Sequence, residues 1–315
     1  MMRMSLLRRE AIGFIGLGQM GARMCPNLLK LGPDTTLKVF DVNPNALKDI
    51  PFPEGFDASK AEMCASPAEV AAQCKKIITM LPNGAIVNEV FNNKETGIWA
   101  TIQEGTIVCD SSTVDPDTPK NLAEQGKAKG VTLFDAPVSG GVNAAASGNL
   151  TFMVGAESEA RFEDAKALLT PMAKGVTFCG PVGAGQVCKL CNNLILAQHM
   201  ISVSEAMLMG TKFGVDPKKL AGIFNTSTGR CWSSDTYNPF PGVMEGVPAS
   251  NNYKGGFGAK LMLKDLGLAV DAAKTAGVEV RGAKNAQKLY SEMAAEGEMG
   301  DMDFGGIIKY IDEKL

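Results

Sequence analysis

The sequence predicts an α/β Rossmann-type N-terminal domain followed by an all-α C-terminal domain, the two joined by a long interdomain helix. Three observations lead to this prediction. Short apolar runs alternate with helical patterns from Ala11 to about residue 180, which is typical of a doubly wound sheet. A glycine-rich turn follows the first of these runs. After Gly183 the strand patterns stop and a long apolar helical stretch begins.

The bulk composition limits the class of protein. The chain has 315 residues, enough for two domains of roughly 150 residues each, and 45% of its residues are apolar. Its net charge is −3 and it holds no basic block, so we expect no nucleic-acid partner. No apolar run reaches the roughly 18 residues that a membrane-spanning helix needs, so we expect no membrane partner either.

The first predicted strand, over 11–16, runs into a G-x-G-x-x-G turn, and a helical stretch continues to about Leu31. Gly16 allows the tight turn, Gly18 lets a pyrophosphate approach the backbone, and Gly21 lets helix and strand pack closely. Free N–H groups at the helix start then face the phosphates. This context predicts a dinucleotide site, and we assign the turn to it: Gly16, Gly18, Gln19, Met20 and Gly21.

An aspartate after the second strand indicates which dinucleotide binds. Asp41 ends the strand predicted over 37–41. An acid at this position accepts hydrogen bonds from the adenosine ribose hydroxyls and repels a 2′-phosphate. No arginine follows in 42–45, so the sequence favours NAD over NADP. An ordinary strand-end aspartate is the alternative interpretation.

Further strands are predicted over 76–81, 106–110, 131–135, 150–154 and 176–179, with helices near 67–73, 115–129 and 157–169. In such sheets ligands bind beyond the carboxyl ends of the strands. Leu81-Pro82, 111–113 and 139–141 all lie there. Ser139, Gly140 and Gly141 combine backbone N–H groups with a hydroxyl, which suits a carboxylate, and a plain turn is the alternative.

The second half is predicted to be helical. The first helix covers about 186–213, and its apolar residues lie nearly all round it, so we expect it to be buried between domains or subunits. A helix starting at Asp216-Pro217, a long irregular surface segment over 230–258, a helix over 257–275 and a tail helix from about Asp303 follow. We therefore divide the chain into a leader (1–10), an NAD-binding domain (11–180) and a helical substrate and dimerisation domain (181–315).

Lys189, near the start of the long helix, is the candidate proton carrier. Asn193 lies four residues later, so the amine and the amide share a helix face. Burial in an apolar helix favours a neutral amine, which suits general acid–base chemistry. A lysine that snorkels out of the helix terminus is the alternative. Lys264 has two interpretations as well: a solvated partner of Asp265, or a lysine that reaches into the interdomain cleft.

The eight cysteines show no disulfide framework, and we expect reduced thiols that are mostly buried. Cys188 and Cys191 spell C-x-x-C but lack a second pair, so we predict no metal site and expect both to pack around Lys189. The single histidine, His199, leaves little room for a histidine-based dehydrogenase. Residues 1–9 carry three arginines and no acid, which is compatible with a very short mitochondrial transit peptide or with a surface leader.

Taken together, these motifs resemble the β-hydroxyacid dehydrogenase family. The resemblance rests on GFIGLGQMG (13–21), DSSTVDP (110–116), DAPVSGGVNAAASGNLTFMVG (135–155), GAGQVCKLCNN (183–193) and KDLGLA (264–269), and covers nearly the whole chain from Ala11. Residues 229–258 resemble the 3-hydroxyisobutyrate dehydrogenase branch rather than the tartronate semialdehyde or glyoxylate reductase branches.

The resemblance implies roles for particular residues. Lys189 matches the catalytic lysine, and Asn193 the asparagine that places the substrate. Residues 139–141 match the loop that binds the substrate carboxylate. The matched cofactor contacts are Leu81, Pro82, Thr113 and Lys264. Residues 83–86 lack an asparagine that some relatives use for the cofactor, so that contact is not carried over.

The resemblance also implies the activity: NAD-dependent oxidation of 3-hydroxyisobutyrate in valine catabolism, by an enzyme that forms dimers or tetramers. Its active site would lie between the two domains. A reductase or dehydrogenase of another small β-hydroxy acid, of the tartronate semialdehyde, glyoxylate or serine type, is the first alternative. A second, more remote alternative is a non-catalytic nucleotide-binding scaffold. Relatives that are non-catalytic scaffolds lose the helix lysine, whereas this chain keeps it.

Overall fold

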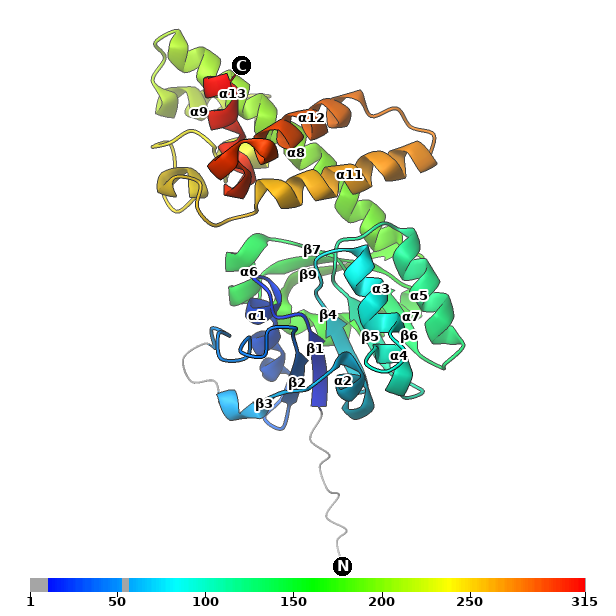
Figure 1. The fold of residues 1–315 in the computed structure, drawn as a ribbon. Helices are drawn as coiled ribbons and strands as arrows, with labels where there is room; N and C mark the ends of the chain where they lie inside the picture. The colour runs from blue at the N-terminus through cyan, green and yellow to red at the C-terminus, as the bar shows by residue number, and fades with distance from the viewer. Residues whose placement is uncertain (1–10, 53–56, 315) are drawn as a thin grey trace, which may run out of the picture. The chain divides into compact units, whose positions relative to one another are not determined.

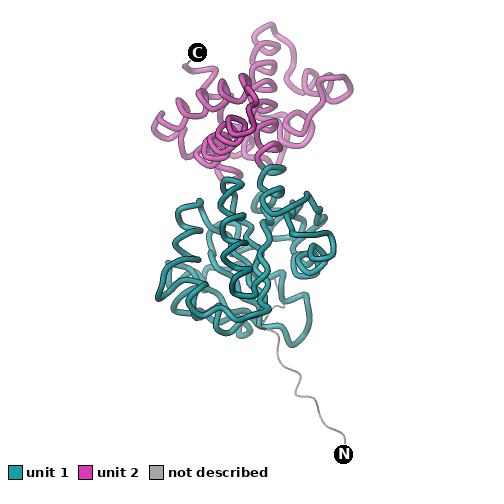
Figure 2. The backbone as a smooth tube through the Cα atoms, turned by 90° about the vertical axis from the view of Figure 1, so that its right-hand side faces the viewer, with its two compact units in different colours: residues 1–189 teal, residues 190–315 magenta. Residues whose placement is uncertain are grey.

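A computed structural model describes residues 11–52 and 57–314. The chain divides into two compact units, residues 1–189 and 190–315 (Figure 2). The division falls within the long helix α8 (Ala184–Lys212), so one continuous helix contributes to both units. The predicted leader, 1–10, lies outside the described residues.

The first unit is built on one twisted sheet (Figure 1), whose described strands run in the order β3-β2-β1-β4-β5-β6-β8-β7, with β9 beside β8. Most neighbours are parallel, while β6–β8 and β7–β8 are antiparallel. This arrangement confirms the predicted Rossmann-type fold. The strands are β1 (Ala11–Ile15), β2 (Thr36–Phe40), β3 (Ala61–Met63), β4 (Lys76–Thr79), β5 (Ile107–Asp110), β6 (Thr132–Asp135), β7 (Val138–Ser139), β8 (Leu150–Gly155) and β9 (Ala173–Gly180).

Helices cover both faces of the sheet because successive strand residues point to opposite faces. Ile77 and Leu133 pack into one buried cluster, whereas their neighbours Ile78 and Phe134 pack into another. The first cluster includes residues of α2 (Pro67–Gln73), α3 (Gly84–Asn92), α4 (Ile98–Thr101) and α5 (Asp117–Lys127). The second includes residues of α1 (Gly21–Met24), the following 3₁₀ helix (Cys25–Leu31), α6 (Gly141–Ser147) and α7 (Glu159–Leu169).

The second unit is helical, as predicted. Its core is formed by buried side chains of α8, α11 and α12 and of the C-terminal segment, among them Met200, Met262, Tyr290 and Phe304. Asp216 caps the helix that follows α8, because its side chain accepts a hydrogen bond from the Lys219 N–H. The other described α-helices of the unit are α9 (Pro217–Thr226), α10 (Trp232–Asp235), α11 (Ala259–Thr275), α12 (Arg281–Ala295) and α13 (Ile307–Lys314).

The segment over 230–258 is largely irregular and on the surface, as predicted, but it contains two short helical turns and a few buried residues. Tyr253 is 5% exposed, and it is held because the Asp303 N–H donates to its carbonyl at 2.8 Å. The Asp303 carboxylate accepts hydrogen bonds from the Tyr237 hydroxyl and the Phe257 N–H, at 2.9 and 2.7 Å. A buried carboxylate in the C-terminal part therefore anchors a segment that sequence composition marks as a loop.

None of the described helices is long and apolar enough to cross a membrane.

Candidate active site

The glycine-rich turn lies where the strand order reverses, between β1 and β4, which is the usual ligand site of a doubly wound sheet. Gly16 has φ of +96°, and a Cβ there would collide with the Met80 carbonyl oxygen. A Cβ on Gly21 would collide with the Gly16 carbonyl oxygen. A Cβ on Gly18, in contrast, would meet no atom within 4 Å. Gly16 and Gly21 thus serve the turn itself, while the space beside Gly18 fits a dinucleotide backbone.

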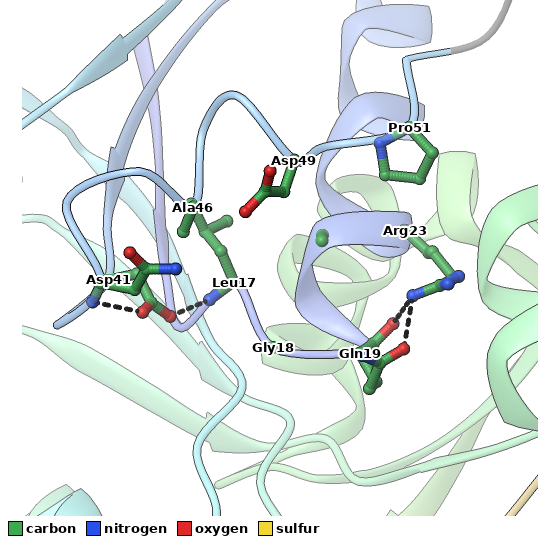
Figure 3. A pocket seen from close by; sticks show the side chains of 10 residues that line it. Leu17, Gly18, Gln19, Arg23, Asp41, Ala46, Asp49 and Pro51 are labelled. Carbon is green, nitrogen blue, oxygen red and sulfur yellow. Dashed lines mark hydrogen bonds between the residues drawn. The ribbon is translucent and has the colours of Figure 1, made fainter. Parts of the chain in front are cut away.

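A cavity of about 350 Å³ lies beside this turn (Figure 3). Asp41 follows β2 at its edge and accepts hydrogen bonds from the backbone N–H groups of Leu17 and Asn43, at 2.7 and 2.8 Å. The predicted strand-end acid is therefore tied directly to the glycine-rich turn. The residues that line the cavity are Leu17, Gly18, Gln19, Ala22, Arg23, Asp41, Asn43, Ala46, Asp49 and Pro51.

Two charged residues of this cavity were not singled out from the sequence. Asp49 adds a second carboxylate, and Arg23 comes from α1. The Arg23 guanidinium donates to the Gln19 carbonyl and side-chain oxygens, at 2.7 and 3.0 Å (Figure 3). Gln19 thus lines the cavity, whereas the side chain of Met20 packs against the hydrophobic core. The two carboxylates suit a ribose and would repel a phosphate beside them, while Arg23 brings one positive charge to the same lining.

The loops after β4 and β5 are joined by buried hydrogen bonds. The Leu81 N–H donates to the Ser112 hydroxyl at 2.9 Å, and that hydroxyl donates to Asp110 Oδ1 at 2.6 Å. The Thr79 hydroxyl donates to the same oxygen at 2.7 Å. Burial raises the pKa of the Asp110 carboxyl, and these donors oppose the shift. The predicted cofactor contacts Leu81, Pro82 and Thr113 therefore lie on two loops that are tied together.

The predicted carboxylate loop is a strand end and a helix start. Ser139 is the last residue of β7, and Gly141 is the first residue of α6. Gly140 and Gly141 have φ of +145° and +65°, which glycine adopts without strain. Ser139, which pairs with Thr151 of β8, is half-buried, and the two glycines are exposed.

The first turn of α8 is held on the sheet by Asp135, at the end of β6. Its carboxylate accepts the N–H groups of Gly183 and Gln186, at 2.7 and 2.9 Å. Burial raises the pKa of this carboxyl to about 6, and the two N–H donors oppose that shift. One turn further along the helix, Lys189 is 8% exposed. The lysine is thus a buried residue near a fixed helix start, and its role as a proton carrier stays a prediction.

In the second unit, Asn193 is paired with an acid that sequence reasoning gave no role. Asn193 is 1% exposed, and its Nδ2 donates to Asp265 Oδ2 at 2.6 Å. Lys264 Nζ lies 3.2 Å from Asp265 Oδ1, which agrees with the ion pair considered for Lys264. The Asn192 amide donates to Asn193 Oδ1 at 3.0 Å. Asp265 therefore contacts two predicted site residues. It lies in the KDLGLA motif, which could have identified it as a site residue from the sequence.

Two family models match the chain. The first, described as the NAD binding domain of 6-phosphogluconate dehydrogenase, matches residues 11–180, and the second, described as NAD-binding of NADP-dependent 3-hydroxyisobutyrate dehydrogenase, matches residues 183–311. A probable mitochondrial 3-hydroxyisobutyrate dehydrogenase of Dictyostelium discoideum is 48% identical, over 99% of this chain and 94% of its own length. The chain belongs to the 3-hydroxyisobutyrate dehydrogenase family.

Other members of the 3-hydroxyisobutyrate dehydrogenase family are nearly as similar. The human mitochondrial enzyme of that name is 46% identical, over 98% of this chain and 89% of its own length. A solved structure of the Mycobacterium tuberculosis enzyme, described with L-serine, is 35% identical with a TM-score of 0.86, and the match covers 96% of this chain and 99% of that one. The chain is thus an NAD-dependent oxidoreductase with the family fold, as the sequence motifs predict.

Within this family fold, the prediction for the two helix cysteines is wrong. Cys188 and Cys191 are exposed and do not pack around Lys189. The reason is helix geometry, since residues one before and two after a given position lie on other faces. Cys25, Cys64, Cys74 and Cys109 are buried as expected, and burial raises the pKa of the Cys74 thiol to about 12. The described residues contain no cluster of three or more His, Cys, Asp or Glu side chains that could hold a metal.

Proposed function

We propose that the chain oxidises 3-hydroxyisobutyrate to methylmalonate semialdehyde with NAD, and that Lys189 takes the hydroxyl proton. The observation that carries the proposal is the burial of Lys189 one turn beyond a helix start that Asp135 holds against the sheet. Burial of a lysine side chain disfavours the charged form in general, and a general base must be neutral to accept a proton. In the reverse direction the ammonium would return the proton to the carbonyl oxygen.

The other site residues would bind and orient the substrate. Ser139, Gly140 and Gly141 would hold the carboxylate, because they offer a hydroxyl and N–H groups to a small anion. The Asn193 amide nitrogen carries two hydrogens, of which Asp265 accepts one, and the second would bind the substrate hydroxyl oxygen. NAD, when bound at the glycine-rich turn, accepts a hydride from the carbon that bears this hydroxyl. Lys264 and the loops that carry Leu81, Pro82 and Thr113 would contact it.

Replacement of the lysine tests this proposal. Lys189→Ala is expected to lower kcat by about 10²- to 10⁴-fold, the usual range for a general acid–base group, while the Kd for NAD is unchanged. In the wild type, oxidation should speed up as pH rises, because the neutral amine is the active form. Lys212→Ala is the matched control, since Lys212 is an exposed lysine at the end of the same helix. Near-normal turnover by the Lys189→Ala variant would exclude the assigned role.

A second substrate is favoured by one observation, namely that the solved M. tuberculosis relative is described with L-serine. A serine dehydrogenase would use the same carboxylate loop and lysine, because serine also carries a hydroxyl two carbons from its carboxylate. The values of kcat/KM for 3-hydroxyisobutyrate, L-serine, tartronate and glycolate would decide between them. The panel should be run with NAD and NADP side by side, because Asp41 and Asp49 favour NAD whereas one matching family description names NADP.

Two further proposals concern assembly and location. We propose a homodimer or homotetramer, because α8 leaves large apolar side chains exposed in the single chain, Val187, Ile195 and Met209 among them at 45%, 51% and 62%. Light scattering coupled to size exclusion would give the number of subunits. We also propose a mitochondrial location, which the names of the similar enzymes support. Fusion of residues 1–10 to a fluorescent protein would test import.

A further inference from the structure

The side chain of Gln186 joins helix α8 to the loop after β5. Gln186 is fully buried, and its Nε2 donates to the Ser112 carbonyl oxygen at 2.8 Å. Its Oε1 accepts the Val114 N–H at 3.1 Å. Both groups of the amide are therefore satisfied by the two residues that flank Thr113, which is a predicted cofactor contact. The glutamine thus holds this loop through two backbone groups, one on each side of Thr113.

The same glutamine lies one turn before Lys189. Residues three apart share a helix face, so Lys189 lies on the side of α8 that packs toward the loop over 112–114. The helix cannot easily shift at this point. Asp135 binds the N–H groups of Gly183 and Gln186, and a Cβ on Gly185 would collide with the Met153 carbonyl oxygen. A displacement of the loop over 112–114 would therefore break contacts with Gln186 rather than drag the helix with it.

The connection continues from this loop to the loop after β4. The Ser112 hydroxyl accepts the Leu81 N–H, so the Ser112 residue contacts Gln186 through its carbonyl and Leu81 through its side chain. One chain of hydrogen bonds, buried at Gln186 and partly buried at Leu81, thus links both predicted cofactor loops to the helical turn that carries Lys189. Such a connection would set the distance between the nicotinamide of bound NAD and the amine of Lys189.

We propose that Gln186 is a positioning residue, which sets the place of the Thr113 loop relative to Lys189. The inference rests on the proposed roles of Thr113 and Lys189. Gln186 itself contacts neither the proton nor the cofactor and acts through these two residues. In Gln186→Met the side chain keeps its length but loses both polar groups, which leaves the Ser112 carbonyl and the Val114 N–H buried without their partner.

The test measures NAD binding and turnover in the full chain. Gln186→Met should raise the Kd for NAD about 5- to 30-fold and lower kcat about 10- to 100-fold, because it leaves two buried polar groups of the loop unpaired. Hydrogen exchange of the cofactor-free protein should increase over 112–116. Gln198→Met removes a half-buried amide elsewhere on α8, which donates only to the Leu194 carbonyl, and should change none of these values. Gln186→Asn, a milder variant, should shift NAD affinity in the same direction if the methionine variant does not fold.

A double-mutant cycle separates positioning from general destabilisation. If Gln186 acts through Thr113, the effects of Gln186→Met and Thr113→Val on NAD affinity should not add. Strict additivity, or a Gln186→Met enzyme with Kd and kcat within twofold of wild type, would overturn the proposal. So would a fall in activity that merely tracks the folded fraction, with an unchanged pH profile. NAD binding and hydrogen exchange do not depend on Lys189 chemistry, so they would still test Gln186 if Lys189→Ala kept its activity.

Discussion

Asp265 offers the sharpest test of how Asn193 is held. The carboxylate is 3% exposed and accepts the Asn193 amide at 2.6 Å on one oxygen, while Lys264 lies 3.2 Å from the other. Asp265→Asn keeps the size and shape of the side chain but removes its charge. The amide that replaces the carboxylate can turn an N–H₂ group toward Asn193, where a donor would face a donor.

The expected magnitude follows from this one short contact. A hydrogen bond to a charged group contributes about 1.5–3 kcal/mol, and each 1.36 kcal/mol corresponds to a factor of about ten in rate. If that energy holds Asn193 in the orientation that the reaction needs, Asp265→Asn should lower kcat about 10- to 150-fold. Lys264 is partly exposed, so water can replace Asp265 as its partner. We therefore assign no part of the expected loss in kcat to the ion pair.

The assay is steady-state oxidation of 3-hydroxyisobutyrate at saturating NAD, together with the melting temperature of each variant. Asp271→Asn is the matched control, because Asp271 is an exposed acid on the same helix α11. Asp265→Asn should reduce kcat with little change in the Kd for NAD. An unaltered kcat in a folded Asp265→Asn enzyme would refute the reasoning that Asp265 orients Asn193.

The remaining predictions concern the glycine-rich turn and the second unit. Gly18→Ala should leave the melting temperature unchanged and weaken NAD binding, since a methyl group there meets no protein atom. Gly21→Ala should instead destabilise the fold, because its methyl group would collide with the Gly16 carbonyl oxygen. Calorimetry and NAD titration measure the two effects, and equal effects of both variants on folding would contradict the assignment. Burial raises the pKa of Asp303 to about 6, above its unfolded value, so the folded state holds the extra proton between the two values and stability falls as pH rises through that window. Between pH 5 and pH 7 the wild type should lose about 1 kcal/mol of unfolding free energy relative to Asp303→Asn. Urea unfolding of both proteins at each pH measures this difference. A difference that does not change with pH would argue against the raised pKa of Asp303.

Local patterns in the sequence were sufficient to predict the glycine-rich turn and the acid that the structure ties to it. The strand, the glycine-rich turn and Asp41 follow one another within 31 residues, counted from Ala11 to Asp41, and each has a backbone or charge requirement that only a few residue types meet. Short apolar runs likewise marked most strands, because a run of four to six residues is a local property of the sequence. Short elements such as β3, β7 and α4 went unpredicted, since two to four residues carry too little periodicity.

The contacts that hold the site residues in place join segments that lie far apart in the sequence. Asp135, Gln186 and Asp265 bind partners that lie 48, 74 and 72 residues away in the chain, and no periodicity connects such positions. The exposure of Cys188 and Cys191 also depended on which face of α8 is covered. The sequence by itself therefore determined the fold class, the dinucleotide turn and the placement of Lys189 and Asn193 four residues apart on one helix, because these rest on spacing. Only the tertiary structure decided which buried acids and amides orient them, because hydrogen bonds between distant segments depend on the order in which the strands and helices pack.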